Sequence, residues 1–339
     1  MARNQLVDCA KAYSCLLVVF GHVLLGIENM GGISQPRFAS LMKDFIWTFH
    51  VPLFMFLSGF VYRLTGEWRG KGTRGRFIIH KAINLGVPYL VFSAVYILVN
   101  SMIPGTNTSY SAGDILHLWT TPVAQFWFLR TLFFLFAMYA LLSCFLDNLW
   151  ITVLLTTLSS IHMLFPGLPF PPGGNIIAWA FSFGFGACLT SLAPLCFSGP
   201  MAAVVIMCHV VIEGALLATG FSGSPVVIEM ERAVGIAASV TVVSNLVRVA
   251  PVRKCLLFIS RYSFPVYLLH TFFTAGVRIG LKKAGILDYG IHVAAGTAAG
   301  VAIPLLVAIA MEKTGWMNVL LYPTRTMKQW KKERGSGES

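Results

Sequence analysis

Two histidines in the first third of the chain are of a residue type that can do acid–base chemistry. Imidazole titrates near neutral pH and has two distinct ring nitrogens, so a positioned histidine can take a proton from a hydroxyl group. His22 interrupts the apolar stretch that begins at Tyr13, and His50 lies two residues before Pro52, which frees a backbone carbonyl. If these stretches span a membrane, both histidines are functional candidates, because polar groups are costly in lipid. For His22 the alternative is a packed ring bonded to a backbone carbonyl.

The spacing of residues before His22 places it on one helical face with a cation. Asp8, Lys11, Cys15, Val18 and His22 follow one another in steps of three or four residues, so they share a face. Lys11 and His22 are separated by about 16 Å along a helix axis, too far to act easily on one reacting atom. The alternative for Lys11 is snorkelling to the membrane surface, with Asp8 as an ion-pair partner.

A basic segment follows the second apolar stretch, and its cations alternate with glycines. Its candidate anion ligands are Arg63, Arg69, Lys71, Arg74 and Arg76. Glycines let backbone N–H groups approach an anion, and cations hold phosphate. Neither a Walker nor a Rossmann pattern is present. The alternative is the positive charge that flanks membrane spans on the cytoplasmic side and contacts lipid headgroups.

Three further motifs carry weaker signals. Ser58 precedes Gly59, and this pair permits close approach of another helix or a ligand, with helix packing favoured for Ser58. Trp127 and Arg130 lie near the start of another apolar stretch, where the arginine is either an interfacial anchor or a site residue. His270 lies within a later stretch, and a structural hydrogen bond is the simpler interpretation for it.

Composition excludes a soluble fold. Of 339 residues, 56% are apolar and 11% are charged, and the mean hydropathy is +0.74. A soluble protein of this size could not hide so much apolar surface. The net charge of +12 is explained by cytoplasmic lysine and arginine rather than by nucleic-acid binding. Seven cysteines without a CxxC pair predict neither structural disulfides nor a metal site.

The apolar runs predict an all-α polytopic membrane protein with about ten transmembrane helices. The expected spans are residues 8–26, 44–62, 82–101, 123–146, 150–166, 175–193, 201–220, 231–248, 256–277 and 290–311. We expect the first to be a retained span and not a signal peptide. Loop charges place both termini in the cytoplasm, with Arg278, Lys282 and Lys283 in an outer loop. Residues 1–312 then form the membrane domain, and residues 313–339 form a basic cytoplasmic tail.

Taken together, these motifs resemble the acyltransferase 3 family of membrane acyltransferases. The matching pieces are Asp8-Cys9-Ala10-Lys11 with Val19-Phe20-Gly21-His22, Phe49-His50-Val51-Pro52-Leu53-Phe54 with Leu57-Ser58-Gly59-Phe60, Trp127-Phe128-Leu129, and Tyr267-Leu268-Leu269-His270. They occur in the expected order over almost the whole chain. Many members have arginine at the position of Lys11; lysine keeps the charge but loses the planar, two-pronged geometry.

The resemblance implies transfer of an acyl group, often acetyl, from cytoplasmic acyl-CoA to a glycan or lipid. His22 is then the expected general base, with Lys11 and the basic segment as ligands of the anionic head of coenzyme A. The expected acceptor is a hydroxyl of an envelope or secreted polysaccharide, or of its lipid-linked precursor, in a bacterial inner or plasma membrane. No tightly bound cofactor is expected. The competing interpretations are a proton-coupled transporter that uses His22, His50 and His270 as relay groups, and a noncatalytic membrane scaffold.

Overall fold

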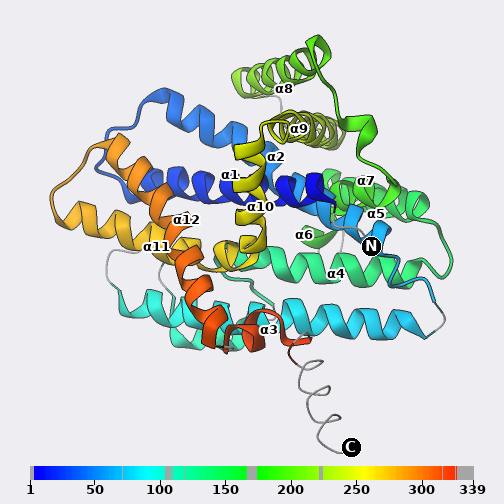
Figure 1. Ribbon diagram of the computed structural model, residues 1–339, viewed down its shortest axis with the longest axis horizontal. Helices are drawn as coiled ribbons and strands as arrows, with labels where there is room; N and C mark the ends of the chain where they lie inside the picture. Colours follow the sequence, from blue (N-terminus) through cyan, green and yellow to red (C-terminus); the bar gives the residue numbers. More distant parts are fainter. Residues whose placement is uncertain are drawn as a thin grey trace, which may run out of the picture. The chain divides into compact units, whose positions relative to one another are not determined.

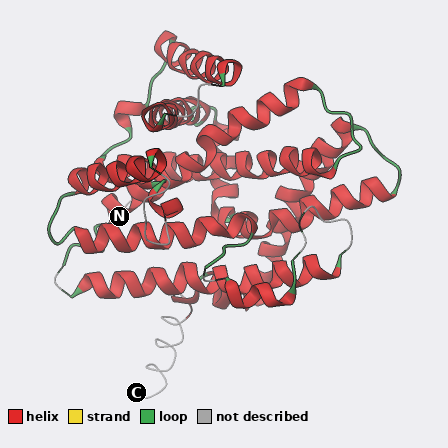
Figure 2. Cartoon of the chain, turned by 180° about the vertical axis from the view of Figure 1, so that it is seen from behind, coloured by secondary structure: helices red, strands yellow, loops and turns green. Residues whose placement is uncertain are grey.

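The computed structural model describes residues 4–70, 72–103, 108, 110–118, 120–165, 174–220, 224–314, 316–324 and 326. Within these residues every regular element is a helix and no strand occurs (Figure 2). The all-α polytopic fold class expected from the sequence is therefore confirmed. Lys71 lies outside the described residues, as does most of the expected basic tail.

The α-helices, labelled in Figure 1 where there is room, follow one another along the whole described chain. They are α1 (Gln5–Met30), α2 (Arg37–Thr65), α3 (Thr73–Met102), α4 (Trp127–Leu142), α5 (Asn148–Leu164), α6 (Gly174–Ile177), α7 (Ala180–Cys188), α8 (Pro200–Thr219), α9 (Pro225–Leu246), α10 (Ala250–Arg261), α11 (Ser263–Lys283), α12 (Tyr289–Thr314) and α13 (Trp316–Leu321). Three short 3₁₀ helices complete the described elements: η1 (Ala112–His117), η2 (Ala124–Phe126) and η3 (Ala193–Leu195).

Seven of the described helical segments are long and apolar enough to cross a membrane. They are α1, α2, α3, α4 together with the preceding turn η2, α8, α11 and α12. The shorter helix α5 is also apolar. A helix lies at each of the ten expected spans, although not every one has the length and composition of a span. The cytoplasmic placement of the termini stays a prediction.

Two of the expected spans need correction. Within 175–193 the main helix is α7, whose 9 residues are too few to cross a bilayer. The expected span 256–277 is two helices, α10 and α11, because Pro265 cannot continue a helix from α10: its ring would clash with the Arg261 carbonyl. Helix α11 then runs to Lys283, so Arg278 is inside a helix and not in the expected outer loop.

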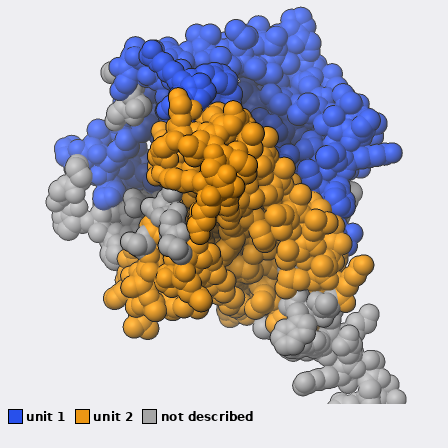
Figure 3. Space-filling view, turned by 90° about the vertical axis from the view of Figure 1, so that its left-hand side faces the viewer, with its two compact units in different colours: residues 1–25, 35–67, 138–263 blue, residues 26–34, 68–137, 264–339 orange. Residues whose placement is uncertain are grey.

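The chain divides into two compact units, coloured separately in Figure 3. The first unit comprises Met1–Leu25, Gln35–Glu67 and Met138–Ser263. An apolar core of this unit joins α1, α2, α9 and α10 through residues such as Ala12, Phe56 and Val240. Asn4 caps the start of α1 by accepting hydrogen bonds from the Leu6 and Val7 amides, at 3.1 and 3.3 Å.

Helices α2 and α7 of the first unit approach each other closely at two glycines. A Cβ on Gly59 would clash with the Phe183 carbonyl, and a Cβ on Gly186 would clash with the Phe56 carbonyl. Small residues let helix backbones approach closely. Membrane helices associate through such van der Waals packing, because lipid provides no hydrophobic driving force between them. The close approach that Ser58-Gly59 permits is therefore made by a helix.

The second unit comprises Gly26–Ser34, Trp68–Ala137 and Phe264–Ser339. A small core of Ile97, Leu118 and Val123 holds α3 against the segment before α4. The described beginning of the expected tail includes α13, which packs on α3. The Thr324 hydroxyl donates to Asn84 Oδ1 at 2.9 Å, so this part of the chain is bonded to the same helix.

We predict that Gly186→Val lowers thermal stability, because the added side chain must separate α7 from α2. Overpacking of this kind costs about 1–3 kcal/mol, and here the obstructing atoms are backbone. Gly214→Val is the matched control, since a Cβ at Gly214 meets nothing within 4 Å. Thermal unfolding of both purified variants in one detergent measures the difference. Equal midpoints for the two variants would contradict the close packing.

Candidate active site

His22 and His50 lie on either side of one tryptophan in the first unit. The ring centroids of His22 and Trp47 are 5.7 Å apart, and those of Trp47 and His50 are 5.3 Å apart with the rings edge to face. A Cβ on Gly21 would sit 3.5 Å from Trp47 Nε1, an ordinary van der Waals contact, so α1 lies directly against the tryptophan here. The two histidines that the sequence singles out are thus brought together by the packing of α1 on α2.

The two imidazoles are oriented in the same way. His22 Nδ1 lies 2.9 Å from the Val18 carbonyl oxygen, and His50 Nδ1 lies 2.7 Å from the Ile46 carbonyl oxygen. A carbonyl only accepts, so each Nδ1 carries the proton in the neutral ring; this tautomer is assigned from the hydrogen bonds. The lone pair is therefore on Nε2 of each ring, the atom that can take a proton.

The two histidines differ in how deeply they are buried. The His50 side chain is 0% exposed, and within the described residues its Nε2 is buried with no hydrogen-bond partner. His22 is only partly buried, so the chain leaves part of its surface uncovered. Buried polar atoms almost always find partners, which makes the His50 nitrogen an exception to be explained. Of the two, His22 is placed better for contact with a substrate.

The polar face of α1 continues from His22 toward the beginning of the helix. Cys15 is buried and its thiol donates to the Ser263 carbonyl at 3.4 Å, while Val18 is 4% exposed. Asp8 and Lys11 are partly buried. Because α1 is continuous between Lys11 and His22, their separation is about 16 Å along its axis. The structure therefore keeps Lys11 away from the reacting atoms of a group held at His22.

The candidate anion ligands fall at the end of α2 and the beginning of α3. Arg63 is partly buried in the last turn of α2. Arg69 is exposed, with its guanidinium 5.4 Å from the Trp68 ring centroid. Arg74 and Arg76 occupy the first turn of α3, where the helix dipole is positive. Cations there are unfavourable for an isolated helix, and a bound anion would offset that cost. Lys71 lies outside the described residues.

A second polar network, in the second unit, joins two of the sequence motifs. Gln125 Nε2 donates to Thr271 Oγ1 at 2.7 Å, and the Tyr267 hydroxyl donates to the Gln125 carbonyl at 2.6 Å. His270 is fully buried beside them, with Nδ1 2.8 Å from the Tyr267 carbonyl oxygen. Ala124 has φ 43°, a strained value for a residue other than glycine. The network therefore fixes the turn before Trp127 against α11.

Two of the sequence-selected residues make local structural bonds. Arg130 Nη1 donates to the Thr120 carbonyl at 3.0 Å, which ties α4 to the preceding segment. Ser58 Oγ donates to the Phe54 carbonyl at 2.8 Å, within its own helix. These bonds account for both side chains by local packing, and neither residue is brought against His22 by any contact described above.

Sequence reasoning missed two features of these helices. Trp47 contacts both imidazoles, and the signal was its position three residues before His50, on the same helical face. Arg278 lies against Gly26, where a Cβ would clash with the guanidinium. Its sequence neighbours Lys282 and Lys283 suggested a loop, whereas all three cations belong to the last turns of α11.

A buried ionisable pair lies where α8 meets α2 and α9. His209 Nδ1 is 3.7 Å from Glu213 Oε1, and the two residues are 4% and 1% exposed. The His209 ring also contacts the rings of Phe45 and Phe49, with centroids 4.9 and 5.1 Å away. The polar contact lies within α8, and the ring contacts of His209 hold this helix against α2. Within the described residues no group of three or more His, Cys, Asp or Glu side chains could hold a metal ion.

The fold and these sites define a polytopic helical membrane protein with intramembrane histidines. The model of the acyltransferase 3 family, an acyltransferase domain, matches residues 4–311. The chain belongs to this family and is a membrane acyltransferase. Comparison with curated proteins and with solved structures found no match.

We predict that His50→Ala lowers the thermal unfolding midpoint more than His22→Ala does. Removal of the fully buried His50 ring leaves a cavity beside Trp47, and loss of a large buried ring costs about 3–5 kcal/mol. The partly exposed His22 leaves a space that solvent or lipid can fill. Thermal unfolding of the two variants in one detergent makes the comparison. A larger loss for His22→Ala would contradict the placement of the two rings.

Proposed function

We propose that this protein is an acyl-CoA-dependent O-acyltransferase in which His22 is the general base. The observation that carries the proposal is the bond between His22 Nδ1 and the Val18 carbonyl, which leaves the basic lone pair on Nε2 of a partly buried ring. A general base needs a ring held in one tautomer within reach of the hydroxyl that it deprotonates. The family match supports acyl transfer as the reaction class.

The proposed reaction is direct transfer from a thioester to a hydroxyl. His22 Nε2 accepts the hydroxyl proton while the acceptor oxygen attacks the thioester carbonyl carbon. The tetrahedral intermediate collapses, the carbon–sulfur bond breaks, and the leaving thiolate takes a proton from the imidazolium. The products are an ester and free coenzyme A thiol, and His22 returns to its neutral form. No net proton is released by the transfer.

Lys11 and the basic segment are the proposed ligands of the donor. Coenzyme A carries several phosphate charges at one end and its thioester at the end of a long pantetheine arm. A separation of about 16 Å between Lys11 and His22 suits a donor whose charged head and reacting carbonyl are far apart. Arg74 and Arg76, in the first turn of α3, add a positive helix terminus to which phosphate binds favourably. Arg63, Arg69 and Lys71 belong to the same proposed set.

The proposed acyl group is acetyl, and the proposed acceptor is a hydroxyl of an envelope or secreted polysaccharide or of a lipid-linked glycan. A cell membrane, bacterial inner or plasma, is the proposed location. A polytopic membrane protein can give a cytoplasmic donor and an extracytoplasmic acceptor access to one helix bundle. Helix α1 fits this arrangement, because it carries the proposed donor ligand near one end and the proposed base near the other.

We predict that His22→Ala lowers the rate of thiol release from acetyl-CoA, in the presence of an acceptor glycan, by about 10²–10⁴-fold. Loss of the base removes proton transfer from the transition state. The readout is free thiol, measured with purified protein whose unfolding midpoint is checked in parallel. The control is His117→Ala in η1, an exposed histidine outside the proposed site. Unchanged turnover in His22→Ala would remove this residue from the mechanism, and solute transport without donor cleavage would favour a transporter.

We predict that Lys11→Gln raises the donor KM by about ten- to a hundredfold, the cost of losing a charged contact, and leaves the acceptor KM unchanged. Lys11→Arg keeps the charge and should retain most of the donor affinity. Lys254→Gln, a change at an exposed lysine of α10, controls for general loss of positive charge. Steady-state kinetics with each substrate varied in turn measures both constants. An equal rise in both KM values would contradict a donor-specific role.

A further inference from the structure

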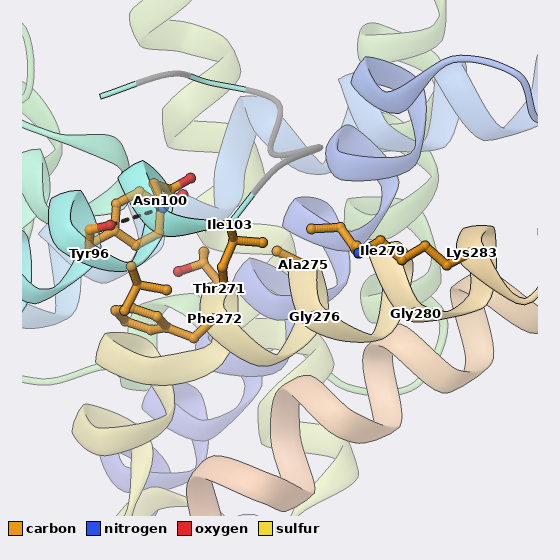
Figure 4. A pocket seen from close by; sticks show the side chains of 11 residues that line it. Tyr96, Asn100, Ile103, Thr271, Phe272, Ala275, Gly276, Ile279, Gly280 and Lys283 are labelled. Atoms are coloured by element: carbon orange, nitrogen blue, oxygen red, sulfur yellow. Dashed lines mark hydrogen bonds between the residues drawn. The ribbon is translucent and has the colours of Figure 1, made fainter. Parts of the chain in front are cut away.

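A pocket of about 310 Å³ lies in the second unit, between the end of α3 and the face of α11 (Figure 4). Tyr96 lines it from α3 and Ile103 from the residue after that helix, and Thr271, Gly276 and Lys283 are among the residues that line it from α11. Its volume is at the low end of the range for small-molecule sites, so it suits one part of a larger ligand. None of its residues belongs to the proposed catalytic or donor-binding set.

Two glycines of α11 keep the pocket open. Gly276 and Gly280 are one turn apart, and a Cβ added to either meets nothing within 4 Å. Small residues in a membrane helix usually allow another helix to pack closely, but within the described residues no helix fills the space beside these two. The first carbon of a side chain would fit at either position without a clash inside the chain. The space that they leave is therefore available to a molecule from outside it.

The pocket is elongated along α11 and has a cation at one end. From Thr271 to Lys283 its α11 residues recur at one face over about 18 Å of helix. Ile103 and Phe272 make the wall between these ends apolar. The Lys283 side chain extends back along the helix toward Ile279 instead of away from the pocket (Figure 4). An apolar channel that ends at an ammonium group matches a chain with an anionic head.

The opposite end of the pocket offers hydrogen bonding. Thr271 Oγ1 already accepts from Gln125 Nε2 at 2.7 Å, so its own O–H is the donor that it can offer. The Asn100 side-chain nitrogen donates to the Tyr96 carbonyl at 3.0 Å, drawn as a dashed line in Figure 4. The same side-chain amide can also accept a hydrogen bond from a ligand through Asn100 Oδ1. Polar groups that fix orientation within an apolar lining are typical of ligand sites.

We propose that this pocket is a binding site for an anionic phospholipid, with one acyl chain along Gly276 and Gly280 and the headgroup phosphate at Lys283. The site lies on two helices that are long and apolar enough to cross a membrane, and both expose much of their surface, so lipid is the molecule that surrounds them. The charge of Lys283 selects an anionic headgroup over a zwitterionic one.

A second copy of the chain is the other occupant to consider, because Gly276 and Gly280 form a GxxxG pattern. A helix with its side chains is about 10–12 Å across, too wide for a pocket of this volume. The wall of Tyr96, Phe272 and Ile103 beside the glycines also prevents the flat contact that such a dimer needs. A single acyl chain is narrower than a helix and needs no flat contact surface.

Native mass spectrometry of the full-length protein in mild detergent tests the proposal, with phosphatidylglycerol and phosphatidylcholine of identical chains as probes. The wild-type protein should bind phosphatidylglycerol about tenfold more tightly than phosphatidylcholine. Gly276→Leu and Gly280→Leu should lose both lipids by filling the pocket. Lys283→Gln should lose only the preference, and Lys283→Arg should keep it.

Two matched variants serve as controls. Gly214→Leu adds the same side chain to an open glycine of α8, and Lys282→Gln removes the neighbouring charge, whose Nζ lies 3.4 Å from the Met30 carbonyl oxygen. Both should bind lipid as the wild type does. Unchanged lipid binding in Gly276→Leu and Gly280→Leu, each shown to be folded by its unfolding midpoint, would overturn the proposal. Loss of a dimeric mass in these variants without loss of lipid would assign the glycines to self-association.

Discussion

The hydrogen bond from His22 Nδ1 to the Val18 carbonyl is the interaction on which the catalytic role depends. It draws on a carbonyl of the same helix, so it forms as soon as α1 does and needs no other element. It fixes the tautomer and places the basic lone pair on Nε2. His50 and His270 are held in the same way by carbonyls of their own helices. Intrahelical bonding of Nδ1 is thus common to these three imidazoles.

The three histidines nevertheless differ in burial, and this difference distinguishes the proposed base from the two histidines that only pack in the protein. His50 and His270 are fully buried, whereas His22 is only partly buried. A base must meet its substrate, so access favours His22 over the other two. Trp47 lies between His22 and His50. It packs against the His22 ring, which is the partly exposed one, and so holds that ring in place. Gly59 provides a short helix separation elsewhere on α2, where its backbone meets that of α7.

Features within one helix were predictable from the sequence, whereas contacts between helices were not. The shared face of Lys11 and His22 follows from residue spacing alone, and the all-α membrane class follows from composition. The bond between Gln125 and Thr271 joins positions 146 residues apart, and no local pattern reports it. The contact between Trp47 and His22 depends on how α1 packs on α2, so spacing within either helix does not report it. The break at Pro265 could have been inferred, yet the apolar run on both sides of it suggested one span.

Nitrogen-15 NMR of histidine-labelled protein in bilayers tests the tautomer of His22 most directly, with its signals assigned by difference from a His22→Gln sample. Near neutral pH the account predicts a protonated Nδ1 and an unprotonated Nε2 whose resonance moves when a donor analogue and an acceptor are added together. A ring protonated at Nε2, or an Nε2 resonance that both substrates leave unchanged, would contradict the assignment of His22 as the base.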